Sequence, residues 1–333
     1  MTNHLWDDEY EHLAEQFDPL HTDRQARRKR KPVPGHRPKK TRDEIIAALA
    51  DVPDELETEF TTTYRPSRYE AGWLLSSLQG FYSEKLIIDV LAQVKGGKEA
   101  SVYRCLAHPA TGYEFLAAKV YRPRRFRSLR NDAVYREGRE VLNEGGAVVK
   151  KNDHRIMRAL GKKTDFGVQV AQTSWLMYEY TTMQHLHQTG AALPRPVASA
   201  HNAILMAYLG DERMAAPTLN EVALNPAEAG ELYHRVLYNV ELMLMHDLIH
   251  GDLSAYNILY WEGEIALIDF PQVVRATENR RARFLLERDV QRVCEYFAAQ
   301  GVDCAPPSEI VDALWERHVH LPPDVPDIPE IEL

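Results

Sequence analysis

Residues 250–259 read HGDLSAYNIL, and residues 265–270 read IALIDF. Asp252 and Asn257 are five positions apart around a tight loop, and Asp269 closes an apolar stretch seventeen positions after Asp252. In phosphoryl transfer, one carboxylate accepts the proton of the attacking hydroxyl, while an amide oxygen and a second carboxylate hold Mg²⁺ against the phosphates. We therefore predict that these three side chains meet at one phosphate-binding centre.

The order H-x-D-x-x-x-x-N followed by D-F is typical of the catalytic and metal-binding loops of kinases. Taken singly, an aspartate in a turn or an amide in a loop needs no such explanation, and only the ordered set favours kinase-like chemistry. Asp252 is the expected base, and Asn257 and Asp269 are the expected metal ligands. His250 is expected to be a structural loop residue, because this chemistry does not require an imidazole.

A second motif, VKGGKEASVY at residues 94–103, places two glycines between stretches that predict strands. Such a hairpin lets backbone approach phosphates closely, although a Gly-Gly pair also suits a plain turn. Lys119 follows in the apolar stretch LAAKVY, where an ammonium group is costly to bury without an anion. The combination is typical of the kinase lysine that binds the α- and β-phosphates. The alternative is an edge-strand lysine whose charged end reaches water.

A lysine in this role needs a carboxylate partner on a nearby helix. Glu179 is the only acidic residue in positions 166–210. It lies in residues 174–190, which predict a helix with Ser174 as a candidate N-cap and Gly190 beyond its end. We expect Glu179 to pair with the lysine, and the alternative is a solvated surface glutamate.

The composition limits the classes of protein that need to be considered. The chain has 333 residues, is 44% hydrophobic and carries a net charge of −9, so it can form a two-lobed unit with a sizeable core. We expect no membrane span and no signal peptide, because long apolar runs are missing and the N-terminus is charged. Three scattered cysteines form no metal motif and favour a reducing compartment, so the expected location is cytoplasmic.

Strand-type segments precede helix-type segments, which predicts an α+β, bilobal protein-kinase-like fold. We expect a small, mostly β N-lobe at 66–209 with a partly mobile insertion near 122–170, and a truncated helical C-lobe at 210–320. A charged, disordered tail at 1–65 and an acidic, proline-rich tail at 321–333 flank them. The expected strands span 87–94, 100–106, 112–122 and 203–209, and the expected helices span 71–78, 174–190, 226–247 and 279–300, with a hairpin turn at Glu262 and Gly263.

The first tail contains a strongly basic segment. Residues 24–42 hold ten Lys or Arg and no acidic residue. Many cations can neutralise nucleic-acid phosphates without reading sequence, so contact with ribosomal RNA or a ribosomal particle is one interpretation. Phe, Tyr and Trp are absent from the segment, so base stacking is not implied. A solvated tail without a partner is an equally open alternative.

Taken together, these motifs resemble those of the RIO family of atypical serine/threonine protein kinases, of the bacterial type. The resemblance is carried by GGKEASVY, LAAKVY, Trp175 with Glu179, AAPTL at 215–219, HGDLSAYNIL and IDFPQ. It extends over about residues 80–300, where FLLERDVQRVCEYF continues it.

The resemblance implies Asp252 as the catalytic aspartate, Asn257 as a Mg²⁺ ligand, and Asp269 as a metal ligand also connected with a phosphoaspartate intermediate. It further implies ATP contacts from the phosphate loop, the lysine, its glutamate partner and a hinge segment, namely Gly96, Gly97, Lys98, Glu99, Ala100, Ser101, Val102, Lys119, Glu179, Met206, Tyr208 and Leu209. The implied cofactors are ATP and Mg²⁺, with Mn²⁺ as an alternative. The implied reaction is phosphorylation of Ser or Thr on the chain itself or on an unidentified protein acceptor, or ATP hydrolysis.

Several positions depart from ordinary protein kinases. The HGD sequence lacks the arginine that usually precedes the catalytic aspartate, and Ser254 stands where many protein kinases place a lysine that steadies the γ-phosphate. Only 64 residues follow Asp269, without an A-P-E motif, so we expect no peptide-docking helices. Pro271 stiffens the metal-binding loop, because proline fixes φ.

Two other functions fit part of the pattern. Small-molecule phosphotransferases of the aminoglycoside or choline kinase type also use HGDxxxxN and a following I-D strand, but the GKEAxVY loop, the short C-lobe and IDFPQ disfavour that class. An ATP-binding, RNA-associated scaffold without turnover is disfavoured because Lys119, Asp252, Asn257 and Asp269 are all present.

Overall fold

The computed structural model describes residue 60 and residues 62–97, 99–122, 139–150, 152–162, 164–200 and 202–319. The basic segment 24–42 and the acidic tail 321–333 lie outside these residues, as does most of the predicted tail 1–65. The domain boundaries predicted there stay predictions.

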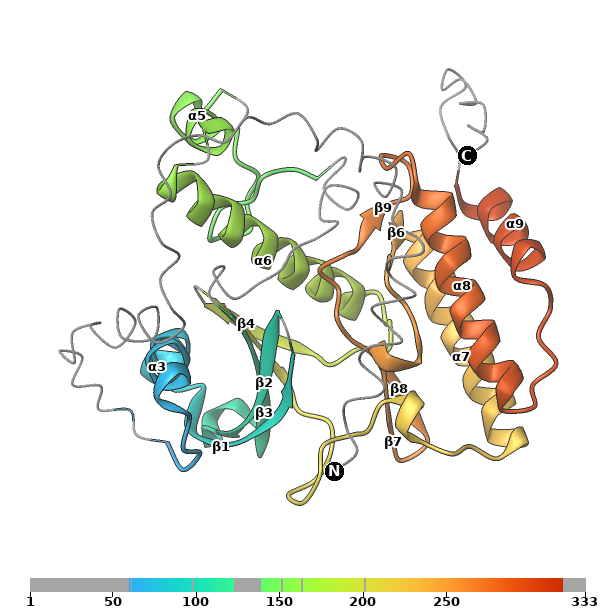
Figure 1. Ribbon diagram of the computed structural model, residues 1–333, viewed down its shortest axis with the longest axis horizontal. Helices are drawn as coiled ribbons and strands as arrows, with labels where there is room; N and C mark the ends of the chain where they lie inside the picture. Colours follow the sequence, from blue (N-terminus) through green and yellow to red (C-terminus); the bar gives the residue numbers. More distant parts are fainter. Residues whose placement is uncertain are drawn as a thin grey trace, which may run out of the picture. The chain divides into compact units, whose positions relative to one another are not determined.

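The N-terminal half of the described chain is built on one antiparallel sheet with the strand order β1-β2-β3-β5-β4 (Figure 1). Its strands are β1 (Ile87–Gly96), β2 (Ala100–Ala107), β3 (Phe115–Tyr121), β4 (Pro196–Ala200) and β5 (Ala203–Ala207). Val102 pairs with Lys119, and Ala117 pairs with Met206. Directly paired residues share a face, so these four side chains lie on one face of the sheet.

The opposite face of the sheet is covered by α3 (Arg68–Ser83), which is longer than the predicted helix 71–78. The helix begins after Ser67, whose backbone N–H donates to the carboxylate of Glu70, 3.3 Å away. Between α3 and the sheet lies a cluster of buried side chains that includes Leu74, Leu78, Phe81, Val90, Tyr103, Cys105, Leu116 and Leu205. The hydroxyl of Tyr103 also donates to Glu70, which ties the helix to β2.

The helix that carries Glu179 is α6 (Asp165–Gln188), and it starts earlier than predicted. Thr164 caps it by accepting the N–H of Gly167 at 3.1 Å, whereas the hydroxyl of Ser174 accepts the N–H of Leu142 at 2.9 Å. The prediction of Ser174 as the N-cap is therefore wrong. Gly190, with φ 88°, follows the end of the helix as predicted.

The stretch 122–170 was expected to be a partly mobile insertion, and its mobility stays a prediction. Its described part contains α5 (His154–Lys162) and the first residues of α6. Residues 123–138 lie outside the described chain. None of the side chains of α5 is buried, although Ile156 and Leu160 lie one turn apart on one side of this helix.

The C-terminal half is mainly helical. It contains α7 (Pro226–Met245), α8 (Ala282–Ala299) and α9 (Pro307–His318), and the strand pairs β6 (Leu248–Ile249) with β9 (Val274–Arg275) and β7 (Ile258–Trp261) with β8 (Glu264–Leu267). Asn225 caps α7 by accepting the N–H of Glu228, with Pro226 in the first turn. The turn between β7 and β8 has φ 50° at Glu262 and φ 84° at Gly263, as a tight hairpin requires, and confirms that prediction.

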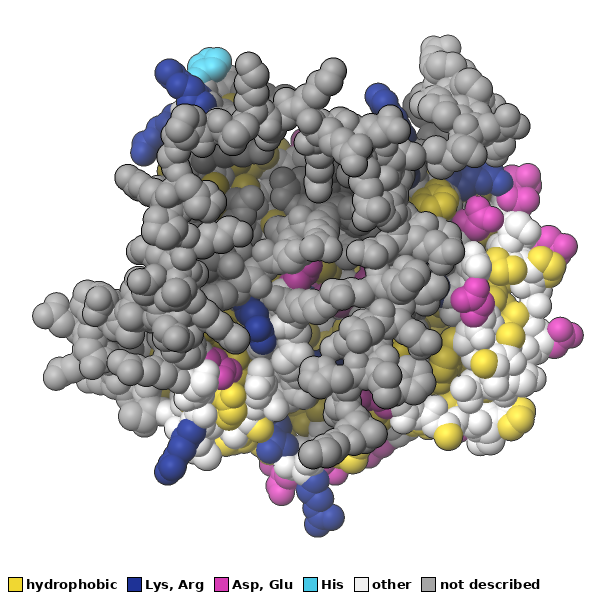
Figure 2. Space-filling view, in the orientation of Figure 1, with side chains coloured by type: hydrophobic (Ala, Val, Ile, Leu, Met, Phe, Trp, Pro, Cys, Tyr) yellow, Lys and Arg dark blue, Asp and Glu magenta, His cyan; other side chains and the backbone are white. Residues whose placement is uncertain are grey.

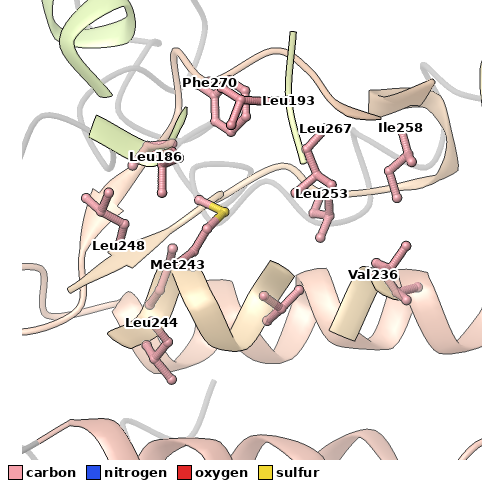
Figure 3. Close-up of a cluster of buried hydrophobic side chains, with 14 of the residues drawn as sticks. Leu186, Leu193, Val236, Met243, Leu244, Leu248, Leu253, Ile258, Leu267 and Phe270 are labelled. Atoms are coloured by element: carbon pink, nitrogen blue, oxygen red, sulfur yellow. The ribbon is translucent and has the colours of Figure 1, made fainter. Parts of the chain in front are cut away.

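A buried apolar cluster lies beneath the loop that carries Asp252 (Figure 3). It joins side chains of α6, α7, β6, β7 and β8 with those of the loops between them, including Leu186, Leu193, Val236, Met243, Leu244, Leu248, Leu253, Ile258, Leu267 and Phe270. Helix α8 is amphipathic: apolar residues such as Leu286 and Val293 point inward, and Figure 2 shows acidic side chains on the surface over α8 and α9.

These elements confirm the predicted α+β class, with a small antiparallel sheet followed by a helical half. Within the described chain, only α8 and α9 follow Asp269 as helices. None of the helices in the described ranges combines the length and apolar character needed to cross a bilayer.

The core beneath the catalytic loop can be tested with two methionines of α7. Met243 is 2% exposed and Met245 is 59% exposed. Met243→Ala should lower the free energy of unfolding by about 2–5 kcal/mol, because it removes buried methylene groups and leaves a cavity. Met245→Ala is the matched control and should change it by less than about 0.5 kcal/mol. Urea unfolding followed by circular dichroism measures both, and equal effects of the two changes would contradict the packing described.

Candidate active site

Lys119 lies between two carboxylates. Its ammonium nitrogen is 2.7 Å from Oε1 of Glu179 and 2.6 Å from Oδ1 of Asp269. The side chains of Lys119 and Glu179 are 11% and 1% exposed. The lysine therefore does not extend into water, and the glutamate is not a surface residue. The structure joins strand β3, helix α6 and the end of the β8 segment through this one ammonium group.

The oppositely charged groups of this cluster stabilise one another's ionised forms. Burial opposes the charged form of Lys119, but the carboxylates of Asp269 and Glu179 outweigh it and hold the pKa of the lysine well above its usual value. Burial would raise the pKa of Asp269, yet the neighbouring ammonium lowers it below its ordinary value. The hydroxyl of Tyr121 donates to the second oxygen of Glu179, and burial raises the pKa of this tyrosine well above its usual range. Lys119 and Asp269 are thus a charged pair at neutral pH.

Asp269 has an unusual backbone. Its φ is 71°, in the left-handed region, where Asp is tolerated better than most residues with a Cβ. Its side chain is 42% exposed, so a carboxylate oxygen remains open to solvent while Oδ1 contacts Lys119.

The catalytic loop is held by its own side chains. A 3₁₀ turn at Ala255–Asn257 brings the amide of Asn257 back to the start of the loop, where Nδ2 donates to the backbone oxygen of Asp252 at 2.8 Å. The amide nitrogen is thereby occupied, which leaves Oδ1 as the atom that can bind a cation. The backbone oxygen of Asn257 accepts the N–H of Ile268 at 2.9 Å, so the loop is fixed to the residue before Asp269.

His250 has a structural role, as predicted. Its Nδ1 accepts the N–H of Asp252 at 3.3 Å, so Nε2 carries the hydrogen and donates to the backbone oxygen of Ile268 at 3.1 Å. Burial lowers the pKa of His250, which keeps the ring neutral. The histidine therefore links the Asp252 loop to the Asp269 strand.

Asp289, on α8, is a site residue that the sequence analysis did not single out. Its carboxylate accepts the N–H of Gly251 at 2.7 Å and of Leu253 at 3.1 Å, on either side of Asp252. Arg288 donates to the backbone oxygen of Gly251. Burial raises the pKa of Asp289 to about 7, against the charge of Arg288. An aspartate on the apolar face of a helix was the signal that could have identified it.

The glycine hairpin between β1 and β2 is only partly described. Gly97 donates its N–H to the backbone oxygen of Ala100 at 2.9 Å, and a Cβ at Gly97 would lie 2.8 Å from that oxygen, so the turn requires glycine. The backbone oxygen of Glu99 accepts the N–H of Arg122 at 2.9 Å. Lys98 lies outside the described residues. Gly96 pairs with Ser101 at the end of the hairpin.

The prediction of Ser101 as an ATP contact needs correction for its side chain. Ser101 pairs with Val120, whereas the next residue, Val102, pairs with Lys119. Because strand side chains alternate between faces, the hydroxyl of Ser101 lies on the face covered by α3, away from Lys119. The sequence motif did not reveal this, because it gives no register. Val102 lies on the face of Lys119, and its contact with the nucleotide stays a prediction.

The predicted hinge follows the same sheet face. Met206, in β5, shares the face of Lys119, and Tyr208 and Leu209 follow the strand. Arg104 of β2 fixes this segment, because its guanidinium lies 5.9 Å from the ring centroid of Tyr208 and donates to the backbone oxygen of Asp211 at 3.0 Å. Arg104 was not among the predicted residues.

Arg139 is a second residue that the motifs did not reveal. Its Nη2 donates to the backbone oxygens of Pro271 and Val273, each at 2.7 Å. Its guanidinium lies 4.3 Å from the ring centroid of Tyr178, the neighbour of Glu179 on α6. Arg139 thus fixes the segment after Asp269 to the helix that carries the lysine's other partner.

The predicted centre is therefore assembled from two bonded groups. Lys119, Glu179 and Asp269 are joined by ion pairs, and Asp252 is joined to Asn257 by hydrogen bonds. Backbone bonds at Ile268 connect the two groups, as described above for His250 and Asn257. That the two groups meet at one phosphate-binding centre stays a prediction.

The donor set fits Mg²⁺ better than a tightly held structural metal. Among the described residues, no group of three or more His, Cys, Asp or Glu could hold an ion by itself. Mg²⁺ commonly takes one or two protein oxygens and completes its shell with phosphates and water. Asn257 Oδ1 and the open oxygen of Asp269 would supply the protein ligands.

A small sheet with a buried, doubly paired lysine, followed by a helical half with an aspartate loop, defines a protein-kinase-like chain. A family model described as "RIO domain" matches residues 101–310, which is more than half of the chain. The chain belongs to the RIO domain family. This confirms the resemblance drawn from the motifs.

Two relatives illustrate the similarity. Serine/threonine-protein kinase RIO1 of Chaetomium thermophilum is 29% identical over 232 residues, which cover 66% of this chain and 41% of the relative. RIO-type serine/threonine-protein kinase Rio1 of Haloferax volcanii is 28% identical over 214 residues, which cover 63% of each chain. This chain thus matches less than two thirds of the length of either relative.

A solved structure is more distantly similar. The crystal structure of the Rio2 kinase-ADP/Mg²⁺-phosphoaspartate complex from Chaetomium thermophilum is 19% identical, with a TM-score of 0.49, over 83% of this chain and 79% of that one. At this TM-score the two chains superpose too poorly for site geometry to be transferred between them.

The buried carboxylate of Asp289 makes stability depend on pH. Its folded pKa of about 7 lies above the ordinary value near 3.9, so its contribution to stability is present below about pH 4 and is lost as the pH rises through 7. The difference in free energy of unfolding between wild type and Asp289→Asn should therefore shrink with rising pH, by on the order of 4 kcal/mol. Urea titrations from pH 4 to 8 measure it, with exposed Asp312→Asn as control. A difference independent of pH would contradict the shifted pKa.

Arg139→Met should loosen the segment that follows Asp269. It removes two hydrogen bonds from a charged donor, each worth about 1.5–3 kcal/mol. The Mg²⁺ concentration for half-maximal turnover should rise about tenfold or more, with partial recovery in Arg139→Lys. Arg155→Met is the matched control, because Arg155 stacks on Phe166 on α6 instead. An unchanged Mg²⁺ dependence would show that Arg139 does not position Asp269.

Proposed function

We propose that this chain is an ATP- and Mg²⁺-dependent phosphotransferase that phosphorylates Ser or Thr, on itself or on a protein acceptor, or hydrolyses ATP. The ion-pair arrangement of Lys119 between Glu179 and Asp269 carries the proposal. Glu179 keeps the buried ammonium of Lys119 in place, and Asp269 can also bind a cation. This arrangement is suited to binding nucleotide phosphates beside Mg²⁺. Membership of the RIO domain family and the names of the relatives support the same activity.

Each residue has a proposed task. Lys119 binds the α- and β-phosphates, and Glu179 keeps its ammonium in place. Asp252 accepts the proton of the acceptor hydroxyl as that oxygen bonds to the γ-phosphorus and ADP leaves. Asn257 and Asp269 would hold Mg²⁺, which would neutralise charge on the phosphates. The backbone of the Gly96–Gly97 hairpin, Val102 and the hinge residues would cover the nucleotide.

A hydrolytic branch uses Asp269 as the nucleophile. A carboxylate oxygen of Asp269 bonds to the γ-phosphorus while the bond to the β,γ-bridging oxygen breaks and ADP departs. Water then cleaves the acyl phosphate and returns a carboxylate and inorganic phosphate. The partly exposed carboxylate of Asp269 and the ammonium group of Lys119 beside it support this branch.

The partners and location are proposed on coarser grounds. The ten cationic residues of segment 24–42 support contact with ribosomal RNA or a ribosomal particle. A reducing compartment, the cytoplasm, is supported by the free thiols of all three cysteines.

The decisive experiment follows γ-labelled ATP with purified protein and tests the stability of bound label to acid and to hydroxylamine. Label stable to both indicates phosphoserine or phosphothreonine, label released by hydroxylamine indicates an acyl phosphate, and free label indicates hydrolysis. Rapid transfer to choline or an aminoglycoside in a parallel panel would favour the small-molecule alternative instead. No nucleotide binding and no turnover would contradict the proposal.

Two substitutions should separate chemistry from binding. Asp252→Ala should reduce transfer to a hydroxyl by at least about 10²-fold with nearly unchanged nucleotide affinity, because it removes the base. Asp269→Ala should instead weaken the binding of Mg²⁺·ATP, measured by calorimetry across a Mg²⁺ titration. Asp312→Ala, which removes an exposed carboxylate of α9, is the control for both. Unaltered turnover in Asp252→Ala would exclude Asp252 as the base.

A further inference from the structure

Arg292 contacts the proposed base directly. Its Nη1 is 2.9 Å from Oδ1 of Asp252, and both side chains are 37% exposed. The two residues are forty positions apart, and the arginine comes from α8, the helix that also carries Asp289. No motif in the sequence indicated this pair.

The two arginines of this helix turn serve different groups. Arg288 donates to the backbone oxygen of Gly251 and lies 3.9 Å from Asp289, so it supports the loop's main chain. Arg292, one turn later, points at the side chain of Asp252, where proton transfer would take place. Helix α8 therefore carries two neighbouring arginines: Arg288 contacts the main chain of the loop, and Arg292 contacts the side chain of the proposed base.

The position of Arg292 is relevant to a difference between this sequence and ordinary protein kinases. Ser254 stands where many protein kinases have a lysine that steadies the γ-phosphate. Negative charge on the transferring phosphoryl group and its oxygens needs cations on the acceptor side as well as on the ADP side. Lys119 is committed to Glu179 and Asp269 on the other side of the site. Arg292 supplies a cation on the side of Asp252.

The side chain is suited to this task. A guanidinium has five N–H donors in a planar fork that matches phosphate oxygens, and the recorded bond to Asp252 uses only Nη1. More than a third of the side chain faces solvent, so it can reorient without disturbing the core. A shift of the guanidinium towards a phosphate would also free Oδ1 of Asp252 to accept the hydroxyl proton.

We propose that Arg292 is a catalytic residue that binds the transferring phosphoryl group in the nucleotide complex, in place of the kinase lysine that Ser254 replaces. This inference rests on the proposed phosphotransfer. Without nucleotide, Arg292 forms the ion pair with Asp252; in the nucleotide complex, its guanidinium moves from Oδ1 of that carboxylate to the phosphate. The alternative is that Arg292 only positions Asp252.

A transition-state analogue separates the two roles. Affinities for ADP·Mg²⁺ and for ADP·Mg²⁺ with aluminium fluoride are compared in wild type, Arg292→Met, Arg292→Lys and Asp252→Ala. Arg292→Met should bind ADP as wild type does, but should bind the aluminium fluoride complex about 10²-fold or more weakly, with a similar loss of single-turnover rate. Arg292→Lys should recover part of both losses. Asp252→Ala should lose transfer while keeping its affinity for the fluoride complex.

Controls make each outcome decisive. Arg283→Met removes an exposed arginine that lies on α8, like Arg292, and pairs with Asp312 of α9, and it should leave every value at the wild-type level. Thermal melting of Arg292→Met and Arg292→Lys reports whether either variant is misfolded. Wild-type affinity of Arg292→Met for the fluoride complex would overturn the inference, even if its turnover fell. A wild-type protein that binds no ADP·Mg²⁺ would instead overturn the proposed function, and this inference with it.

Discussion

One buried ammonium group constrains the rest of the site. A lysine inside a protein is stable only if anions surround it, and Lys119 has two of them within hydrogen-bonding distance. One carboxylate belongs to a helix of the N-terminal half, and the other follows a strand of the C-terminal half. Neither half can therefore hold the lysine by itself in this arrangement. The ion pairs require β3, α6 and the Asp269 segment to stay together.

The catalytic loop depends on a second buried titratable group, the carboxyl group of Asp289. Asp289 binds the two N–H groups that flank Asp252, and His250 and Asn257 connect the same loop to the strand before Asp269. The reactive aspartate is thus positioned through its neighbours' backbone and keeps its own carboxylate exposed. Helix α8 contributes both this support and the arginine that contacts the carboxylate. A helix without any catalytic motif consequently controls the position of the base.

The sequence predicted those features that chemistry fixes locally. Lys119, Asp252, Asn257 and Asp269 were identified because each stands in a motif with fixed spacing, and the two-lobed α+β class followed from the order of the segments. The sequence could not predict which residues pair across the fold. The motif gives no reason to distinguish Ser101 from Val102 as an ATP contact. Only the strand register shows that Val102 lies beside Lys119. Arg139, Asp289 and Arg292 act through partners more than thirty residues away, which spacing along the chain cannot indicate.

The left-handed backbone at Asp269 narrows which residue can occupy this position. Asparagine shares the tolerance of aspartate for this conformation, since a short polar side chain can bond to its own backbone. Glutamate would carry its carboxylate one methylene farther from Lys119. Side-chain length thus separates the two acids here independently of any metal, while an asparagine would preserve the turn and lose only the charge.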